Sequence, residues 1–272
     1  MAGMIALNKI FTKNNILKAM NDDSKLKFYA KSLRSTHYDI FEYLYNELVK
    51  NYRSEYVYKN TLFNKLLLGK HNLNTTSALV ELPVGKSIAD FVLLNGTATV
   101  YEIKTELDSL DRLETQVNNY YKAFDLVYVV ISENHLNSVM SILESTSVGI
   151  IVLTSRMTLS IKREAIRYTD RLDKNIWFSM LRKYEFEEIL NAYYGFLPET
   201  NDFEYYNACR DLFLKIDYNL LYKKFLFCLK NRNFKKYSNE QIECLPKSLR
   251  SLIYFSKFSK SDYSKLISFL NN

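Results

Sequence analysis

Glycine and proline are scarce in this chain of 272 residues, which has six glycines and three prolines. Folds built mainly from short strands and tight turns need many such residues, so the composition favours long helices over an all-β architecture. No apolar stretch approaches the ~20 residues of a membrane-spanning helix, and the short apolar run near the N-terminus does not predict a signal peptide. We therefore expect no membrane association.

Cysteine is equally rare. Cys209, Cys228 and Cys244 are an odd number and have no Cys-x-x-Cys spacing. This pattern argues against a disulfide framework or a zinc site and indicates a reducing, cytoplasmic setting. The three histidines are far apart in the sequence, so no histidine-based metal site or catalytic triad is predicted.

Hydrophobic residues make up 47% of the chain and charged residues 25%, which is typical of a globular protein with an ample core in one large or two small domains. The net charge of +7 suits a polyanionic partner such as nucleic acid. A lysine-rich surface that reflects an AT-rich genome is the plainer explanation. The charge alone does not decide between them.

The strongest chemical signals lie between Ser87 and Tyr120, a stretch that predicts a strand, a turn, a second strand and a helix. Glu102 and Lys104 are two residues apart on the second strand, so both side chains point to one face of the sheet. A solvated Glu–Lys pair is common on antiparallel sheets, and these two residues alone would indicate no more than that. Asp90 on the preceding strand changes the interpretation.

The turn between the two strands decides whether Asp90 meets Glu102. A two-residue loop at 95–96 would send Asp90 to the opposite face. A three-residue loop that ends at a left-handed Gly96 places Asp90 opposite Val100 and diagonal to Glu102, about 7–8 Å away. We expect this loop or an equivalent bulge.

Two carboxylates and an amine on one sheet face indicate metal-assisted chemistry on a phosphate. Carboxylates that close repel each other unless a cation neutralises them. Mg²⁺ or Mn²⁺ would do so, activate a water and stabilise charge on a phosphate. Lys104 would position that water or balance the negative charge of the transition state.

The following helix presents Arg112, Gln116 and Tyr120 at intervals of four residues, on a stripe that looks over the site. Gln116 can orient Lys104, a carboxylate or a substrate phosphate, and Arg112 can pair with a phosphate through two hydrogen bonds. A solvated helix face is the alternative. The stripe expected to face the core comprises Leu110, Leu113, Val117, Tyr121 and Phe124.

These features together resemble the PD-(D/E)xK nuclease superfamily. The resemblance rests on Asp90, on the tripeptide Glu102-Ile103-Lys104 and on the helical segment 116–120 (QVNNY), whose Gln-hydrophobic-x-x-Tyr pattern is similar to that of the RecB-like branch. Small stand-alone bacterial and phage members are the most similar group. The resemblance covers roughly residues 75–155. Ala89 stands where the name-giving motif has proline, a position that varies across the superfamily.

The resemblance implies an α/β fold, with a restriction-endonuclease-like αβββαβ core around a mixed central sheet. It further implies a Mg²⁺ or Mn²⁺ site at Asp90 and Glu102 and a catalytic role for Lys104, with Gln116 in support. An upstream glutamate often completes such a metal site.

Glu81 matches that upstream position best, and Glu42 and Glu47 on an earlier predicted helix are its rivals. The residues expected to contact substrate or to support the site from behind are Arg112, Tyr120 and, in the turn before Asp90, Lys86.

Two domains are expected: residues 1–165 as the nuclease-like core with N-terminal helices, and 166–272 as a helical C-terminal subdomain. In the latter, residues 230–237 interleave lysine and arginine with aromatic residues, which suits stacking on unpaired bases. A helical bundle with aromatic core residues is the alternative. A homo-oligomer contact or a protein partner through this region is also expected.

The function predicted is a metal-dependent nuclease that hydrolyses phosphodiester bonds, with DNA favoured, in mobile-element biology or phage–host conflict. The main alternative is a catalytically inactive nuclease-like module that docks nucleic acid or a protein. A third hypothesis is an interaction protein, such as a phage-encoded regulator, that works through its basic helical half.

Overall fold

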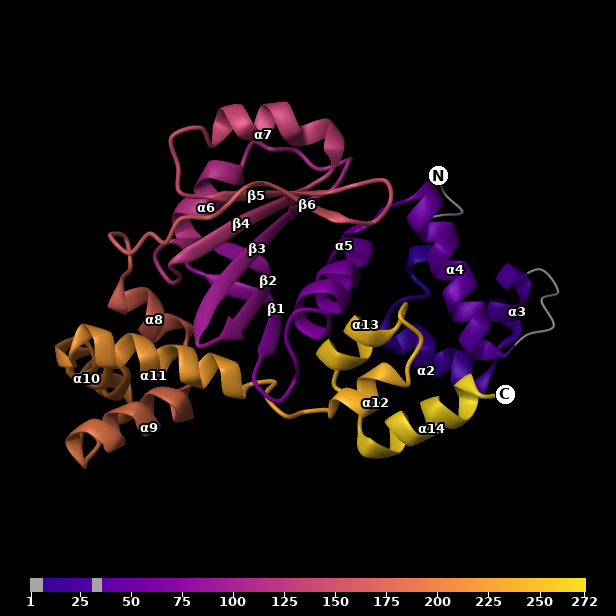
Figure 1. The fold of residues 1–272 in the computed structure, drawn as a ribbon. Helices are drawn as coiled ribbons and strands as arrows, with labels where there is room; N and C mark the ends of the chain where they lie inside the picture. Colours follow the sequence, from indigo (N-terminus) through magenta and orange to yellow (C-terminus); the bar gives the residue numbers. More distant parts are fainter. Residues whose placement is uncertain (1–6, 31–35) are drawn as a thin grey trace. The chain divides into compact units, whose positions relative to one another are not determined.

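The computed structural model describes residues 7–30 and 36–272, and the chain divides into two compact units (Figure 1). Residues 1–76 and 235–272 make the first unit, and residues 77–234 make the second. The boundary expected at residue 165 is not among these, because helices beyond it share one hydrophobic core with the sheet. These two units are the parts of the chain that pack most densely within themselves. The division at residue 165 into a nuclease-like core and a helical subdomain stays a prediction.

The first unit is helical in its described residues. The helical spacing of apolar residues over 36–52 predicts a helix, which is present as α4. The sequence also predicts a helix over 55–68, and this segment continues from an α-helix into a wider π-helical turn. The helices are α2 (Lys13–Asn21), α3 (Ser24–Ala30), α4 (His37–Asn51), α5 (Glu55–Leu62), the π-helix η1 (Phe63–Leu68), α12 (Asn239–Glu243), α13 (Arg250–Phe255) and α14 (Lys260–Leu270).

The second unit is built on a six-stranded mixed sheet with the strands in chain order, β1 to β6. The first three strands pair antiparallel, β3, β4 and β5 are parallel, and β6 returns antiparallel on the edge. The continuous apolar run over 125–132 predicts a strand buried on both faces of a sheet, and it forms β4 between two parallel neighbours. The strands are β1 (Ser77–Val84), β2 (Ser87–Asn95), β3 (Thr97–Lys104), β4 (Leu126–Ile131), β5 (Gly149–Leu153) and β6 (Leu159–Arg163).

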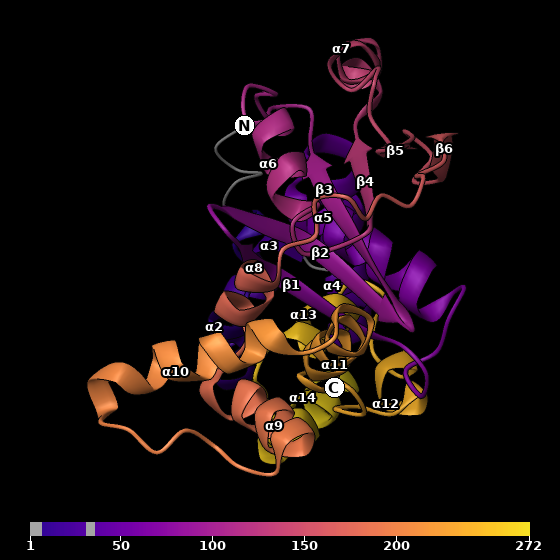
Figure 2. The same ribbon diagram turned by 90° about the vertical axis from the view of Figure 1, so that its left-hand side faces the viewer.

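Helices of the second unit pack with the sheet into one core. Figures 1 and 2 show α7 at the end of the unit near β5, and α9 and α10 at the opposite end. The mixed α/β fold with a helical C-terminal region is confirmed. The helices are α6 (Leu113–Tyr120), the 3-10 turn η2 (Glu133–His135), α7 (Leu136–Ile142), α8 (Lys174–Met180), α9 (Lys183–Tyr194), α10 (Asp202–Lys215) and α11 (Tyr218–Asn231).

Aromatic stacking joins α8 to α11. The Trp177 ring is fully buried and stacks on Tyr222 and Phe225, with ring centroids 5.0 and 5.7 Å away. Such pairs add to the free energy gained by burying large side chains. Among the described residues, no helix is both long enough and apolar enough to cross a lipid bilayer.

The β2–β3 turn is tighter than predicted. Asn95 pairs with Thr97, so Gly96 alone separates the paired residues, and its φ of +71° is the left-handed conformation expected of it. Val100 therefore lies opposite Val92 and not opposite Asp90. The predicted register was wrong by two residues. Because side chains alternate with a period of two, this error leaves every side chain on its predicted face.

A buried ion pair ties α9 to the end of α11. The Arg232 guanidinium donates to both carboxylate oxygens of Glu185, at 2.8 and 2.5 Å, and to the Met180 carbonyl oxygen at 2.8 Å. Glu185 also accepts a hydrogen bond from the backbone N–H of Arg182, which caps α9. Both charged side chains are nine-tenths buried or more.

Replacing Arg232 with methionine is expected to lower the free energy of unfolding by about 3–5 kcal/mol, because Glu185 would be left as an uncompensated buried charge. Adding Glu185→Gln should recover part of that loss, since the amide removes the charge and still caps the helix. Urea unfolding of both variants measures this. If Arg232→Met alone has a free energy of unfolding within about 1 kcal/mol of the wild-type value, the buried ion pair does not stabilise the fold as proposed.

Candidate functional site

An irregularity in the β1–β2 ladder brings two acidic residues together. Regular pairing runs as far as Val80 opposite Phe91 and resumes at Leu82 opposite Ala89. Between these pairs lie Glu81 on β1 and Asp90 on β2, which this register places across from each other.

Glu81 has a φ of +51°, a left-handed conformation that is rare for residues other than glycine and costs about 1–3 kcal/mol. At this irregularity, the alternation of core-facing and outward-facing residues along β1 is interrupted. On β1 the core includes Leu79 before Glu81 and Leu82 after it, a spacing that strict alternation does not allow. The backbone distortion therefore lets Glu81 leave the regular pleat while Leu79 and Leu82 stay buried.

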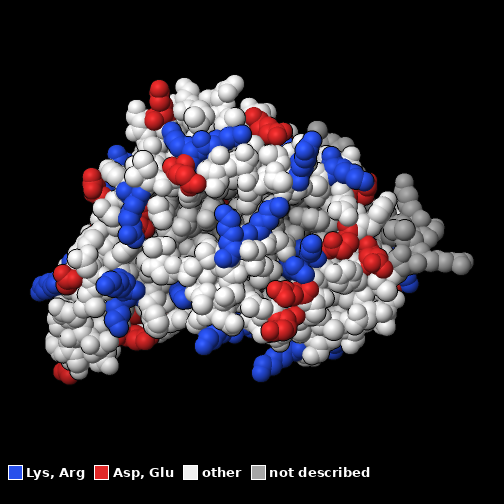
Figure 3. Space-filling view, in the orientation of Figure 1, with Lys and Arg blue, Asp and Glu red and all other residues white. Residues whose placement is uncertain are grey.

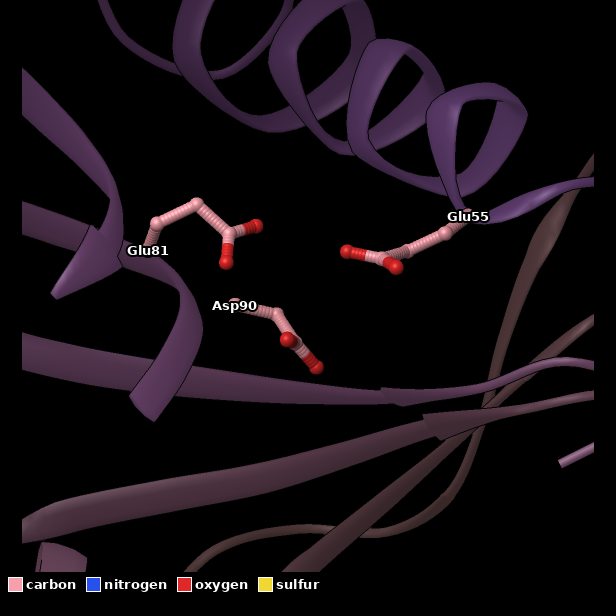
Figure 4. A group of neighbouring side chains, drawn as sticks. All are labelled: Glu55, Glu81 and Asp90. Atoms are coloured by element: carbon pink, nitrogen blue, oxygen red, sulfur yellow. The ribbon is translucent and has the colours of Figure 1, made fainter. Parts of the chain in front are cut away.

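The carboxylate oxygens of Glu81 and Asp90 lie within 4.8 Å of one another, and Figure 4 shows the two side chains on neighbouring strands. Glu55, the third residue labelled there, begins α5 of the first unit. Two carboxylates suit Mg²⁺ or Mn²⁺, which take hard oxygen ligands and complete their shells with water or phosphate oxygens. The upstream glutamate that the structure brings to Asp90 is thus Glu81, the residue favoured from the sequence.

Asp90 also links β2 to the middle of the Glu102-Ile103-Lys104 tripeptide. The regular β2–β3 pairing reaches Phe91 opposite Tyr101. Just beyond it, the Asp90 carboxylate accepts a hydrogen bond of 2.7 Å from the Ile103 backbone N–H. The side chain of Asp90 thus binds the backbone of β3 between Glu102 and Lys104.

Glu102 lies at the centre of a buried polar network and is 1% exposed. One carboxylate oxygen accepts from the Lys104 ammonium at 2.9 Å and from the Gln116 amide at 2.5 Å. The Gln116 carbonyl oxygen in turn accepts from Lys104 at 2.8 Å. Glu102, Lys104 and Gln116 therefore form a closed triangle of hydrogen bonds between β3 and α6.

Tyr120 completes this network from the next turn of α6. Its hydroxyl lies 2.5 Å from the second Glu102 oxygen, to which it donates, and 2.7 Å from the Ile88 carbonyl oxygen. Burial first, and then the negative charge of Glu102, raise the pKa of Tyr120 far above its usual value, so the hydroxyl stays a donor. Tyr120 is fully buried and positions Glu102, rather than lying on the surface where substrate would bind.

Other predicted residues lie apart from this network. Lys86 is exposed in the turn before β2, and Arg112 is exposed at the start of α6. The rival glutamates belong to α4 in the first unit, where Glu42 accepts from the Ser248 backbone N–H and Glu47 accepts from Lys50. The sequence did not predict that the Ile103 backbone N–H would bind Asp90, because every residue except proline carries this group and it leaves no sequence signal.

A comparison with protein-family models matches residues 49–252 to the description "Bacteriophage P4 protein cII". The match covers most of the chain, including every residue of the site in the second unit. The chain belongs to the bacteriophage P4 protein cII family. The family description states no activity.

One relative in this family is protein cII of Enterobacteria phage P4, which is 31% identical over 108 residues. That alignment covers 39% of this chain and 40% of the relative, so less than half of the phage P4 protein is matched. Among solved structures, a protein of unknown function from Silicibacter pomeroyi aligns with a TM-score of 0.30 and 12% identity, over 44% of this chain and 82% of that protein.

The left-handed Glu81 predicts an unusual order of stability. In a regular strand, glycine is less stable than alanine by roughly 0.5–1 kcal/mol. At the φ of Glu81 we expect the reverse: Glu81→Gly should be more stable than Glu81→Ala by about 1 kcal/mol, because alanine keeps the steric strain. Urea unfolding of both variants tests this, and a more stable alanine variant would mean that Glu81 is not left-handed in solution.

Adjacent tyrosines provide a matched test of the Glu102 network. Tyr120→Phe is expected to lower the free energy of unfolding by about 1.5–3 kcal/mol, because it removes a donor to a buried carboxylate. Tyr121 is equally buried, but its hydroxyl has no hydrogen-bond partner among the described residues. Tyr121→Phe should therefore be neutral or stabilising. Equal losses in both variants, measured by urea unfolding, would rule out a specific role for the Tyr120 hydroxyl.

Proposed function

We propose that this protein is a metal-dependent nuclease of the PD-(D/E)xK type that hydrolyses phosphodiester bonds in nucleic acid. The observation that best supports the proposal is the arrangement around one tripeptide of β3. Asp90 binds the backbone N–H of Ile103, and Gln116 joins Glu102 to Lys104 on either side of it. A solvated Glu–Lys pair would need no such buried framework.

Glu81 and Asp90 are the proposed ligands of Mg²⁺ or Mn²⁺, with Glu102 as a third. A carboxylate offers about four acceptor sites. Three acceptor sites of the Glu102 carboxylate are occupied, by donors from Lys104, Gln116 and Tyr120. The fourth acceptor site lies on the oxygen that Tyr120 contacts and is left for the metal. When bound, the metal would lower the pKa of a water and offset negative charge on the phosphate.

Lys104 is held so that it can act at the scissile phosphate. Its ammonium has three N–H donors, and Glu102 and Gln116 accept from two of them. The third donor is left for a water or a phosphate oxygen. Because burial and two hydrogen bonds restrict the ammonium, little reorganisation is needed as negative charge develops in the transition state.

Nucleic acid, with DNA favoured, is the proposed substrate. Exposed Arg112 and Lys86 are available for phosphate contacts. Figure 3 shows lysine and arginine side chains scattered over the visible face with acidic side chains between them, so the net charge does not by itself locate the substrate. Membership of a phage protein family suits a role in mobile-element biology or phage–host conflict.

A catalytically inactive module that docks nucleic acid or a protein is the second candidate. The observation that favours it is the deep burial of Glu102, whose two oxygens both accept hydrogen bonds from within the chain. Such a carboxylate would then be structural, and neither metal binding nor cleavage would depend on it.

Cleavage and metal binding together test the proposal. Labelled single- and double-stranded DNA and RNA are incubated with Mg²⁺ or Mn²⁺, and Mn²⁺ binding is followed by calorimetry. Asp90→Asn should lower both cleavage, by at least about 100-fold, and Mn²⁺ affinity, by at least about tenfold. Lys104→Met should lower cleavage to the same extent yet keep the Mn²⁺ affinity, because lysine is not a ligand.

The matched control is Glu114→Gln, which removes an exposed carboxylate from α6 two residues before Gln116 and should retain full activity. The thermal midpoint of each variant establishes that it is folded. If cleavage persists in both Asp90→Asn and Lys104→Met, and in the wild type with EDTA, the activity does not come from this site. Nucleic-acid binding without cleavage or Mn²⁺ binding would favour the inactive module.

A further inference from the structure

The first unit contains a half-open cavity of about 450 Å³ between α12, the start of α14 and the chain before α12. This volume is in the range of small-molecule sites. Its lining combines aromatic rings with cationic and amide groups. The lining includes Lys236, Tyr237, Gln241, Phe258, Lys260 and Tyr263.

Positive charge is concentrated around this cavity. The Lys236 ammonium donates to the carbonyl oxygens of Tyr254 and Ser256, at 2.8 and 2.5 Å, which leaves its third N–H. Burial first, and then the charges of Lys13 and Lys257, lower the pKa of Lys236 to about 8. An anion in the cavity would relieve this crowding of like charges.

Helix α14 begins at the cavity and adds to its positive potential. Its N-cap residue Ser259 and its first residue Lys260 both line the cavity. The N-terminus of a helix attracts anions through its partial positive charge. Asp262 lies in the first turn, but its carboxylate accepts hydrogen bonds from the backbone N–H and the hydroxyl of Ser259, so it is committed to capping the helix.

Aromatic rings form the apolar part of the lining. Tyr237 and Tyr263 lie with ring centroids 5.7 Å apart, and the Lys13 ammonium lies 5.3 Å from the centroid of Phe258. Tyr237 is 8% exposed, and its hydroxyl is buried with no hydrogen-bond partner among the described residues. Because this hydroxyl is buried, Tyr237 contributes its ring to the lining.

We propose that this cavity binds a nucleoside phosphate. Lys260, Lys236 and the N-terminus of α14 would hold the phosphate, and the rings of Phe258 and Tyr263 would stack on the base. The side-chain NH₂ group of Gln241, whose carbonyl oxygen accepts from the Ser238 backbone N–H, would donate to a polar group of the base or sugar. The site uses none of the residues assigned to phosphodiester hydrolysis and stands without that assignment.

Two sources supply this chemistry: a free mononucleotide, or the terminal nucleotide of a strand with a 5′-phosphate. Binding to the full chain is measured by calorimetry in EDTA, which removes any contribution from a metal site. The probes are deoxyadenosine monophosphate, deoxyadenosine, inorganic phosphate, and a short oligonucleotide with and without a 5′-phosphate.

Lys260→Ala is expected to weaken binding of the monophosphate by at least tenfold. Lys265→Ala, which removes an exposed lysine of the same helix outside the cavity, should change it by less than twofold. Phe258→Leu should weaken binding of the monophosphate and leave binding of inorganic phosphate unchanged. Deoxyadenosine should bind at least tenfold more weakly than its monophosphate.

A preference for the 5′-phosphorylated oligonucleotide over the free monophosphate would identify a strand end as the ligand, and the reverse would identify a free nucleotide. The proposal is overturned if neither binds, or if Lys265→Ala weakens binding as much as Lys260→Ala. It is equally overturned if inorganic phosphate binds as tightly as the monophosphate, since the base would then contribute nothing.

Discussion

Burial of the Glu102 carboxylate is the constraint on which the site in the second unit depends. A carboxylate removed from water is tolerated when cations and hydrogen-bond donors replace its solvent, and it destabilises the fold when they do not. Here the cation comes from Lys104 on the same strand, and the donors come from Gln116 and Tyr120 on α6. The network therefore fixes how α6 lies on the sheet, and fold and site are stabilised by the same contacts.

The β1–β2 irregularity adds what this buried network lacks, a pair of more accessible carboxylates. Glu81 occupies a strained conformation between regular pairs of a well-ordered ladder. Strain of this kind persists where the surrounding structure determines it, and it is concentrated at functional sites. Hydrogen bonds from Lys104, Gln116 and Tyr120 hold the buried Glu102 in place, while Glu81 and Asp90 offer oxygen ligands. Under the proposed function, Glu102 belongs to both groups: Lys104, Gln116 and Tyr120 position it, and it joins Glu81 and Asp90 as a metal ligand.

The sequence predicted the parts of this arrangement that follow from short-range periodicity. The sequence predicts the first core strand over 77–84, and β1 has these bounds. The core stripe predicted for the helix after β3 was right at Leu113 and Val117. The shared face of Glu102 and Lys104 follows from alternation alone. The register of the β2–β3 hairpin does not, because it depends on how tightly one glycine turns.

Other features had no sequence signal at all. Nothing in the residues around Glu81 marks its left-handed backbone, which arises from pairing with a second strand. Tyr120 belongs to a recognisable stripe, but whether such a tyrosine faces substrate or a buried carboxylate depends on how α6 packs. The cavity beside α14 depends on how α12 and the start of α14 pack together, which the order of residues 236–264 does not specify.

The most direct test of the central claim is anomalous diffraction from a crystal of this protein soaked in Mn²⁺. The account predicts one strong anomalous peak within coordination distance of the Asp90 and Glu81 carboxylates, about 2.0–2.3 Å from their oxygens, with Glu102 still bonded to Tyr120. A peak elsewhere, or none beside Asp90 at millimolar Mn²⁺, would contradict it. Glu102 and its partners would then be a structural network, and the site would hold no catalytic metal.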